Sequence, residues 1–138
     1  MRFGCGSISR QMDWQDAMPF GGLLGIEAVG ASAEEVRLRL AWREELCTAG
    51  GLMHGGALMA LADSAGGVCA FLNLPDGAKG TATISSSTSF LRPVRDGYAE
   101  AISRPLNVGR TVIAVETDVV DAAGRHVARV VQSQAVFR

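Results

Sequence analysis

The sequence is poor in lysine and carries no excess of charge of either sign. Lys79 is the only lysine among 138 residues, arginine supplies the remaining positive charge, and the formal net charge is -1. Nucleic-acid-binding domains usually show a run of basic residues, and none occurs here. We therefore expect no nucleic-acid partner.

Cysteine is also scarce, and its positions suggest no disulfide framework because the residues are odd in number and irregularly spaced. They are Cys5, Cys47 and Cys69. The N-terminus lacks the apolar stretch and cleavage site of a signal peptide. Asp63 and Ser64 interrupt the longest apolar run, which makes it a poor membrane span. We expect a cytoplasmic protein without a membrane partner.

Several catalytic motifs are missing as well. The sequence has no Gly-x-Ser-x-Gly elbow, no phosphate-binding glycine loop that ends in Lys-Ser/Thr, and no paired metal-ligand motif. We expect neither a metal ion nor a cofactor. A thiol nucleophile formed by Cys47 with His54 stays open, although neither an electropositive cluster nor an orienting partner accompanies the pair.

The most informative segment that is present runs from Leu52 to Val68. It opens on His54-Gly55-Gly56 and is then apolar on every side, with Asp63 as its one carboxylate. A helix without a polar face is expected to be buried almost all round. Because burial of an unpaired carboxylate is costly, Asp63 must be paired, must face a cleft or must serve in chemistry.

The glycines at the start of this run suit the chemistry of an activated ester. They leave backbone N–H groups accessible at a helix N-terminus, where an oxyanion binds favourably. A thioester needs no strong general acid, because its leaving thiol has a pKa of about 8.5. A carboxylate that attacks directly or activates water would complete the reaction, and the sequence leaves both roles open.

The remaining sequence is typical of strands, with 48% apolar residues available for one core. Helices are expected over Asp13–Met18 and His54–Leu72. The expected strands are Gly21–Val29, Glu35–Trp42, Thr81–Leu91, Tyr98–Arg104, Arg110–Val120 and His126–Phe137. A hydroxyl row on one face of the third strand would comprise Thr83, Ser85, Ser87 and Ser89, with Ala82, Ile84 and Phe90 on the other face. Residues 121–124 predict a hairpin turn. A lone apolar helix among strands predicts an α+β domain in which a curved antiparallel sheet wraps the helix.

His54-Gly55-Gly56, with Asp63 nine residues after the histidine, resembles the hotdog-fold acyl-CoA thioesterases of the PaaI-like, phenylacetate-degradation group. The likeness covers nearly all of residues 1–138 as a single domain. Supporting segments are Phe20–Ile26, Ser89–Val94 and Val108–Arg110. The resemblance implies a hotdog fold with a short N-terminal helix, a homodimer with a continuous sheet, and often a homotetramer of two dimers.

The resemblance also implies roles for individual residues. Asp63 would be the nucleophile or general base, and the Gly55 N–H would polarise the thioester carbonyl. Thr83 matches the family's Ser or Thr on the strand after the helix, whereas Thr48 stands where the family commonly has Asn. His54 and Gly56 complete the motif. Substrate-binding candidates are Thr48 and Gly56, with Arg92, Arg95 and Arg110 for the CoA phosphates.

Helix geometry adds one constraint. Gly55 and Asp63 are eight residues apart, which is about 12 Å along a helix, whereas one carbonyl needs both groups within roughly 3 Å. Either the helix starts after Gly55, or the site combines Gly55 of one subunit with Asp63 of another.

Structural roles remain possible for the same residues. In such a role Ser64 or Thr83 would only cap the Asp63 carboxylate, and His54 is expected to orient its loop rather than transfer protons. At the level of function, the leading hypothesis is hydrolysis of acyl-CoA to free acid and CoA. The alternative is a non-catalytic acyl-CoA binding or sensing protein of the same fold, and a hotdog dehydratase fits less well because its helix start differs from His-Gly-Gly. The acyl preference and the choice between dimer and tetramer stay open.

Overall fold

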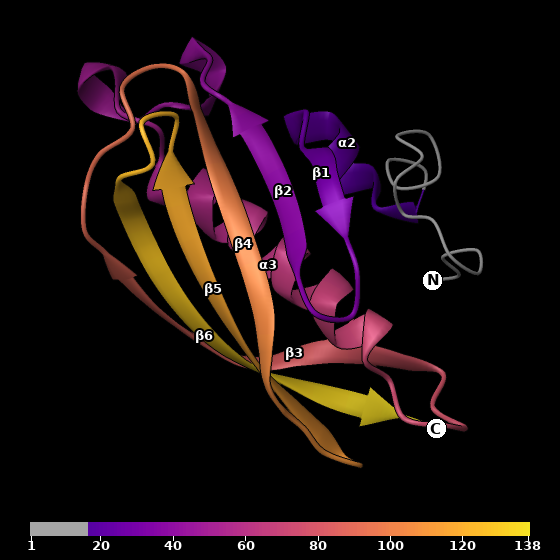
Figure 1. Ribbon diagram of the computed structural model, residues 1–138. Coiled ribbons are helices and arrows are strands. Elements are labelled where there is room, and N and C mark those ends of the chain that lie inside the picture. The colour runs from indigo at the N-terminus through magenta and orange to yellow at the C-terminus, as the bar shows by residue number, and fades with distance from the viewer. Residues whose placement is uncertain (1–16) are drawn as a thin grey trace.

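The computed structural model describes residues 17–138, which form one antiparallel sheet around one long helix (Figure 1). The strands are β1 (Glu27–Ala31), β2 (Val36–Ala41), β3 (Gly80–Phe90), β4 (Tyr98–Val108), β5 (Val112–Asp121) and β6 (His126–Phe137). The helices are α2 (Pro19–Leu24) and α3 (Gly55–Leu72), with short 3-10 turns at Glu44–Leu46 and Ala49–Gly51. The strand order is β1-β2-β4-β5-β6-β3, so β1 and β3 are the edges. The expected α+β architecture is confirmed.

Helix α3 begins where the sequence places its N-terminus. His54 is the N-cap in an extended conformation, and its Nδ1 accepts a hydrogen bond of 2.7 Å from the Gly56 N–H. The helix ends at Asn73, whose side-chain amide donates to the Cys69 and Ala33 carbonyls. Among the described residues α3 alone is long and apolar enough to suit a membrane span, but half of it is buried inside the fold. That is the position of a core helix.

The core lies between α3 and the face of the sheet that it covers. Where α3 crosses β4, the inward residues Ala99 and Ala101 are small and fully buried, which lets helix and strand approach closely. The buried apolar residues of α3 are Leu58, Leu61, Ala62, Ala65, Val68, Cys69 and Ala70. Opposite them lie Val36, Leu38, Leu40, Ile113, Val115, Val119, Ala128 and Val130 of the sheet.

The expected strand over Gly21–Val29 is wrong in its first half. Pro19 occupies the first turn of α2, a position where its fixed φ favours a helix and its missing N–H is not needed. Gly25 ends the helix with φ 84°, and the Ile26 N–H donates to the Gly21 carbonyl as in a Schellman motif. Only β1, Glu27–Ala31, is extended. Residues 13–16 of the other expected helix lie outside the described residues.

The expected hydroxyl row on β3 is also wrong, because a β-bulge interrupts the strand between Thr83 and Ser85. Thr83 is paired with Gln134 and faces the helix, whereas Ser85 is paired with Ser133 on the opposite face. Beyond the bulge, Ser87 and Ser89 share the face of Ser85, while Ser86, Thr88 and Phe90 share that of Thr83. The bulge therefore separates Thr83 from the serines and directs it toward α3.

Candidate functional site

The carboxylate of Asp63 lies at the middle of α3 and is held by two donors from the sheet. Its Oδ1 accepts 2.7 Å from the Thr83 hydroxyl and 2.8 Å from Nε2 of Gln132. Ser64 takes no part, because its hydroxyl donates to the Ala60 carbonyl one turn earlier. Among residues 17–138, Oδ2 of Asp63 has no hydrogen-bond partner. One oxygen is thus fixed, and the other is available to a ligand.

A second row of polar groups supports the first. Nε2 of Gln134 lies 2.7 Å from the Thr83 hydroxyl and 3.3 Å from Oε1 of Gln132. The Thr81 hydroxyl lies 3.3 Å from Oε1 of Gln134. Both glutamines are 1% exposed, in line with Val130 on the inward face of β6. The sequence analysis missed them, although two glutamines at alternating inward positions of an apolar strand are the signal that reveals them.

A cavity of about 290 Å³ opens beside Asp63, between α3 and the start of β3. Among the described residues that line it, Asp63 alone has a charged side chain. Its other lining residues are Met18, Gly67, Val68, Phe71, Gly80, Thr81, Ala82, Thr83, Gln134 and Phe137. An uncharged apolar group fits such a lining.

At the other end of the motif, the N-terminus of α3 offers one backbone donor. The Gly56 N–H donates to the His54 ring, and the N–H groups of Ala57 and Leu58 donate to the His54 carbonyl. Among the described residues the Gly55 N–H alone of these four amides lacks a partner. His54 therefore holds the start of the helix through these bonds. The Gly55 N–H is left available as a hydrogen-bond donor.

The Gly55 end faces a different cavity, of about 390 Å³. A Cβ at Gly55 would lie 3.2 Å from the Phe90 ring, so glycine permits this close approach. The cavity brings together three of the predicted site residues, Thr48, Gly55 and Arg92. It is lined also by Leu52, Met53, Leu58, Phe90, Leu91 and Pro93.

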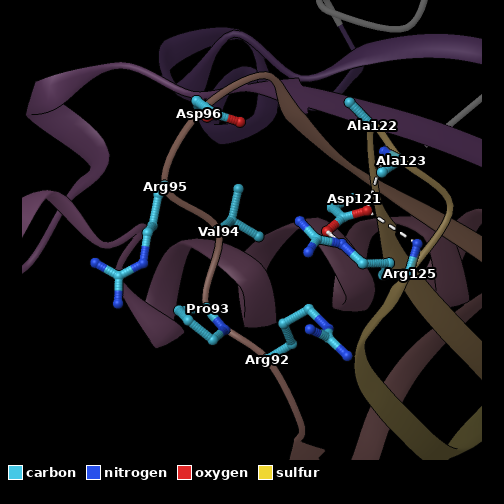
Figure 2. Close-up of a pocket in the computed structure, with 9 residues that line it drawn as sticks. All are labelled: Arg92, Pro93, Val94, Arg95, Asp96, Asp121, Ala122, Ala123 and Arg125. Carbon is cyan, nitrogen blue, oxygen red and sulfur yellow. Dashed lines mark hydrogen bonds and ion pairs between the residues drawn. The ribbon is translucent and has the colours of Figure 1, made fainter.

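Next to it lies a cavity of about 520 Å³, between residues 92–96 and the hairpin at 121–125. Figure 2 shows Arg92 extending toward the hairpin, where Arg125 is paired with Asp121 at 2.9 Å, whereas Arg95 points away from it. Arg110 lies beyond the other end of β4, so one chain does not bring it to this cavity. Within one chain, the structure groups Arg92 with Gly55 and leaves Arg110 apart.

Of the two geometric alternatives left by the sequence, a helix that starts after Gly55 is wrong. Helix α3 begins at Gly55, not after it, so Gly55 and Asp63 stand about 12 Å apart along one straight helix. They also line separate cavities. One chain therefore does not bring Gly55 and Asp63 to the same carbonyl.

The two thiols among the described residues, Cys47 and Cys69, do not provide a competing nucleophile. Cys47 donates to the Arg43 carbonyl at 3.4 Å, and the His54 nitrogen Nδ1 already accepts from Gly56. Burial raises the pKa of the Cys69 thiol to about 11, which keeps it protonated and unreactive. Among the described residues, no group of three or more His, Cys, Asp or Glu side chains is placed to hold a metal ion.

Comparison with known proteins gives a consistent result. The sequence profile of the thioesterase superfamily matches residues 50–128. A relative in Halobacterium salinarum is 39% identical over 104 residues, 72% of this chain and 68% of its own. One in Saccharolobus solfataricus is 30% identical over 115 residues, 83% and 81% of the two chains. One in Thermoplasma volcanium is 36% identical over 87 residues, 63% of this chain and 64% of its own. Each of these three relatives has a name that describes it as an esterase.

Solved structures share the whole fold. A thioesterase of Haemophilus influenzae superposes with a TM-score of 0.86 at 21% identity, over 100% of this chain and 93% of its own. A variant of the phenylacetic acid degradation protein PaaI from Thermus thermophilus superposes with a TM-score of 0.76 at 26% identity, over 87% and 99%. The expected hotdog fold is therefore confirmed.

Proposed function

Because the chain belongs to the thioesterase superfamily, in its PaaI-like hotdog group, we propose that it hydrolyses acyl-CoA thioesters to free acid and CoA. The observation that carries the proposal is the Asp63 carboxylate. Two donors hold its Oδ1, and its Oδ2 has no partner among the described residues. It lines an apolar cavity. A carboxylate held in this way is suited to activate water or to attack a carbonyl.

In the general-base form of the reaction, Oδ2 of Asp63 takes a proton from water as the water oxygen attacks the thioester carbon. The carbonyl oxygen becomes an oxyanion and accepts a hydrogen bond from the Gly55 N–H. The C–S bond then breaks, and the CoA thiolate leaves and takes up a proton. A preorganised oxyanion donor is worth roughly 3–4 kcal/mol of barrier. In the nucleophilic form, Oδ2 attacks the carbon itself, and water later cleaves the resulting anhydride.

Both forms require Gly55 and Asp63 at one carbonyl, and we propose that two subunits supply them. The edge position of β3 supports this, because within residues 17–138 its 11 residues pair only with β6 and leave a row of backbone groups for a second chain. Two antiparallel copies of α3 across a two-fold axis would form two equivalent sites. Assembly of two such homodimers into a tetramer remains part of the proposal.

The cavities suggest how the substrate is divided between the two half-sites. The lining beside Asp63 favours an uncharged acyl group, because a second carboxylate there would face Asp63, and none of the described lining residues is cationic. Arg92 favours the phosphates of CoA at the Gly55 end. Thr48, in the same cavity, is placed to contact the thioester, and Arg95 and Arg110 are proposed phosphate contacts.

A thiol-release assay over short, medium, long and aromatic acyl-CoAs tests this function, with Asp63→Asn as the matched variant. We expect turnover of uncharged acyl groups, and a loss of at least about a hundredfold in Asp63→Asn, which removes the base at nearly constant shape. Full activity of Asp63→Asn would overturn the assignment. Retained acyl-CoA binding without turnover by the wild type would instead favour the binding protein.

A further inference from the structure

We propose that Gln132 is a positioning residue for Asp63: its buried amide, seated against Gly66, holds Oδ1 so that Oδ2 faces the substrate. The inference rests on the proposed function, because it concerns the same carboxylate. Gln132 lies on β6, 69 residues from Asp63 in sequence, and none of the motifs at the helix start includes it.

The ionised carboxylate sets the direction of every hydrogen bond in this cluster. Asp63 can only accept, so Gln132 must turn its NH₂ toward Oδ1 and its Oε1 toward Gln134. Gln134 then donates to Gln132 and to the Thr83 oxygen. This leaves the Thr83 proton for Oδ1 of Asp63. Each amide is therefore held in one orientation by its neighbour.

Gly66 makes room for the amide between helix and sheet. A Cβ at this position would lie 1.9 Å from Oε1 of Gln132, so any other residue would displace the Gln132 side chain. The adjacent Gly67 shows no such requirement, because its Cβ would meet nothing within 4 Å. A glycine in a helix interior costs about 1 kcal/mol relative to alanine. At Gly66 this cost is accompanied by a benefit, because the missing side chain leaves room for the contact between Gln132 and Asp63.

Gln132 acts through Asp63 and does not contact the substrate. It is 1% exposed, and it is absent from the lining of the cavities beside Asp63 and Gly55. Its loss should therefore lower kcat and leave KM unchanged. A residue that bound substrate would alter KM.

The test compares Gln132→Met and Gln132→Glu with Ser133→Ala, a control on the outward face of the same strand. Gln132→Met keeps the length of the side chain but removes the donor, and we expect kcat to fall roughly ten- to a hundredfold, with KM within about twofold. The Ser133→Ala variant should retain the wild-type kcat. A wild-type kcat in Gln132→Met would overturn the proposal.

The Gln132→Glu variant separates positioning from a general structural role. The introduced carboxyl can donate to Asp63 only while it is protonated, and a neighbouring carboxylate favours that form. We expect its kcat, relative to wild type, to rise as the pH falls from about 8 to about 5.5. The ratio for Gln132→Met should stay constant. Equal pH dependence in the two variants would contradict the inference.

Two further measurements keep the proposal falsifiable if Gln132→Met folds poorly or the wild type is inactive. Gly66→Ala changes neither Gln132 nor Asp63 but displaces the Gln132 amide, and it should lower kcat as Gln132→Met does. The side-chain ¹⁵N–¹H resonances of Gln132 should differ in chemical shift between the wild type and the Asp63→Asn variant. This comparison does not depend on activity. An inactive wild type would contradict the proposed function alone, whereas unmoved Gln132 resonances would contradict this inference alone.

Discussion

At the scale of single residues, Thr83 connects the two polar rows of the site. Its hydroxyl donates to Asp63 and accepts from Gln134, so it uses both functions of the group. It lies on the exposed edge strand, yet the bulge at residue 84 turns it inward. One hydroxyl thereby joins the catalytic candidate to the buried glutamines.

Thr83→Ala should lower kcat by roughly ten- to a hundredfold, because it removes a donor to the charged Asp63 carboxylate, and such a hydrogen bond is worth about 1.5–3 kcal/mol. Thiol release by the purified variant, at saturating acyl-CoA, measures this. Ser85→Ala is the control, because the bulge places Ser85 on the opposite face. An unchanged rate in Thr83→Ala would return the hydroxyl to a structural role.

The sequence predicted part of this site for a definite reason. Asp63, Gly55 and His54 belong to one contiguous motif, so their spacing on a helix was readable, and Thr83 followed from the resemblance. Gln132 joins the cluster through β6, and its contact depends on strand register and on the space at Gly66. Register over 69 residues of separation is a tertiary property that no local pattern contains.

At the scale of elements, long uninterrupted segments were predicted well, whereas a short helix and a bulge within a strand were missed. Helix α3 and strand β6 lie within one residue of their expected ends, because a long apolar run defines α3 and sustained alternation defines β6. Helix α2 was missed because six residues are too few to show a helical period. Its signals are the proline at its start and the glycine at its end. The bulge in β3 was missed because alternation alone implies a regular strand.

The hairpin between β5 and β6 is an element whose stability depends on one charge. Asp121 accepts from the Arg125 and Ala123 N–H groups through Oδ1 and from the Arg125 guanidinium through Oδ2. These bonds hold the pKa of Asp121 below its ordinary value, and the bond from the Arg125 backbone N–H has the largest effect. A depressed pKa means that the stabilisation is present above the pKa of the unfolded chain and is lost as the pH falls through that of the folded protein.

Asp121→Asn should therefore lower the melting temperature at neutral pH, and the difference from wild type should shrink as the pH falls from about 5 to below about 3. Asparagine keeps an oxygen acceptor for the turn, so the comparison isolates the charge. Thermal unfolding followed by circular dichroism over this pH range measures the effect. A difference that stayed constant with pH would contradict the role of the charge.

At the scale of the whole molecule, the length of α3 divides the site. Gly55 and Asp63 are about 12 Å apart along one helix, so the proposed site needs two chains. Two inactive variants should then complement each other. Mixed dimers of Asp63→Asn with Gly55→Pro contain one site with both defects and one with neither. We expect up to half of the wild-type activity for each mixed dimer.

The measurement uses differently tagged variants that are co-expressed and purified by both tags in sequence. Proline at the first helical position is tolerated by helices, and circular dichroism should establish that Gly55→Pro folds. Each variant alone is expected to be inactive. If verified mixed dimers of two folded variants recover no activity, the site is not shared between subunits.

The division of Gly55 and Asp63 between separate cavities has a further consequence for the concentration at which the protein works. In the proposed shared site, a lone chain would hold every required group and yet have no complete site, so chemistry would begin only when a second chain arrives. Specific activity should then fall on dilution below the dissociation constant of the pair. Freshly synthesised chains would be latent until they meet, and dimer formation itself would be the step that switches hydrolysis on.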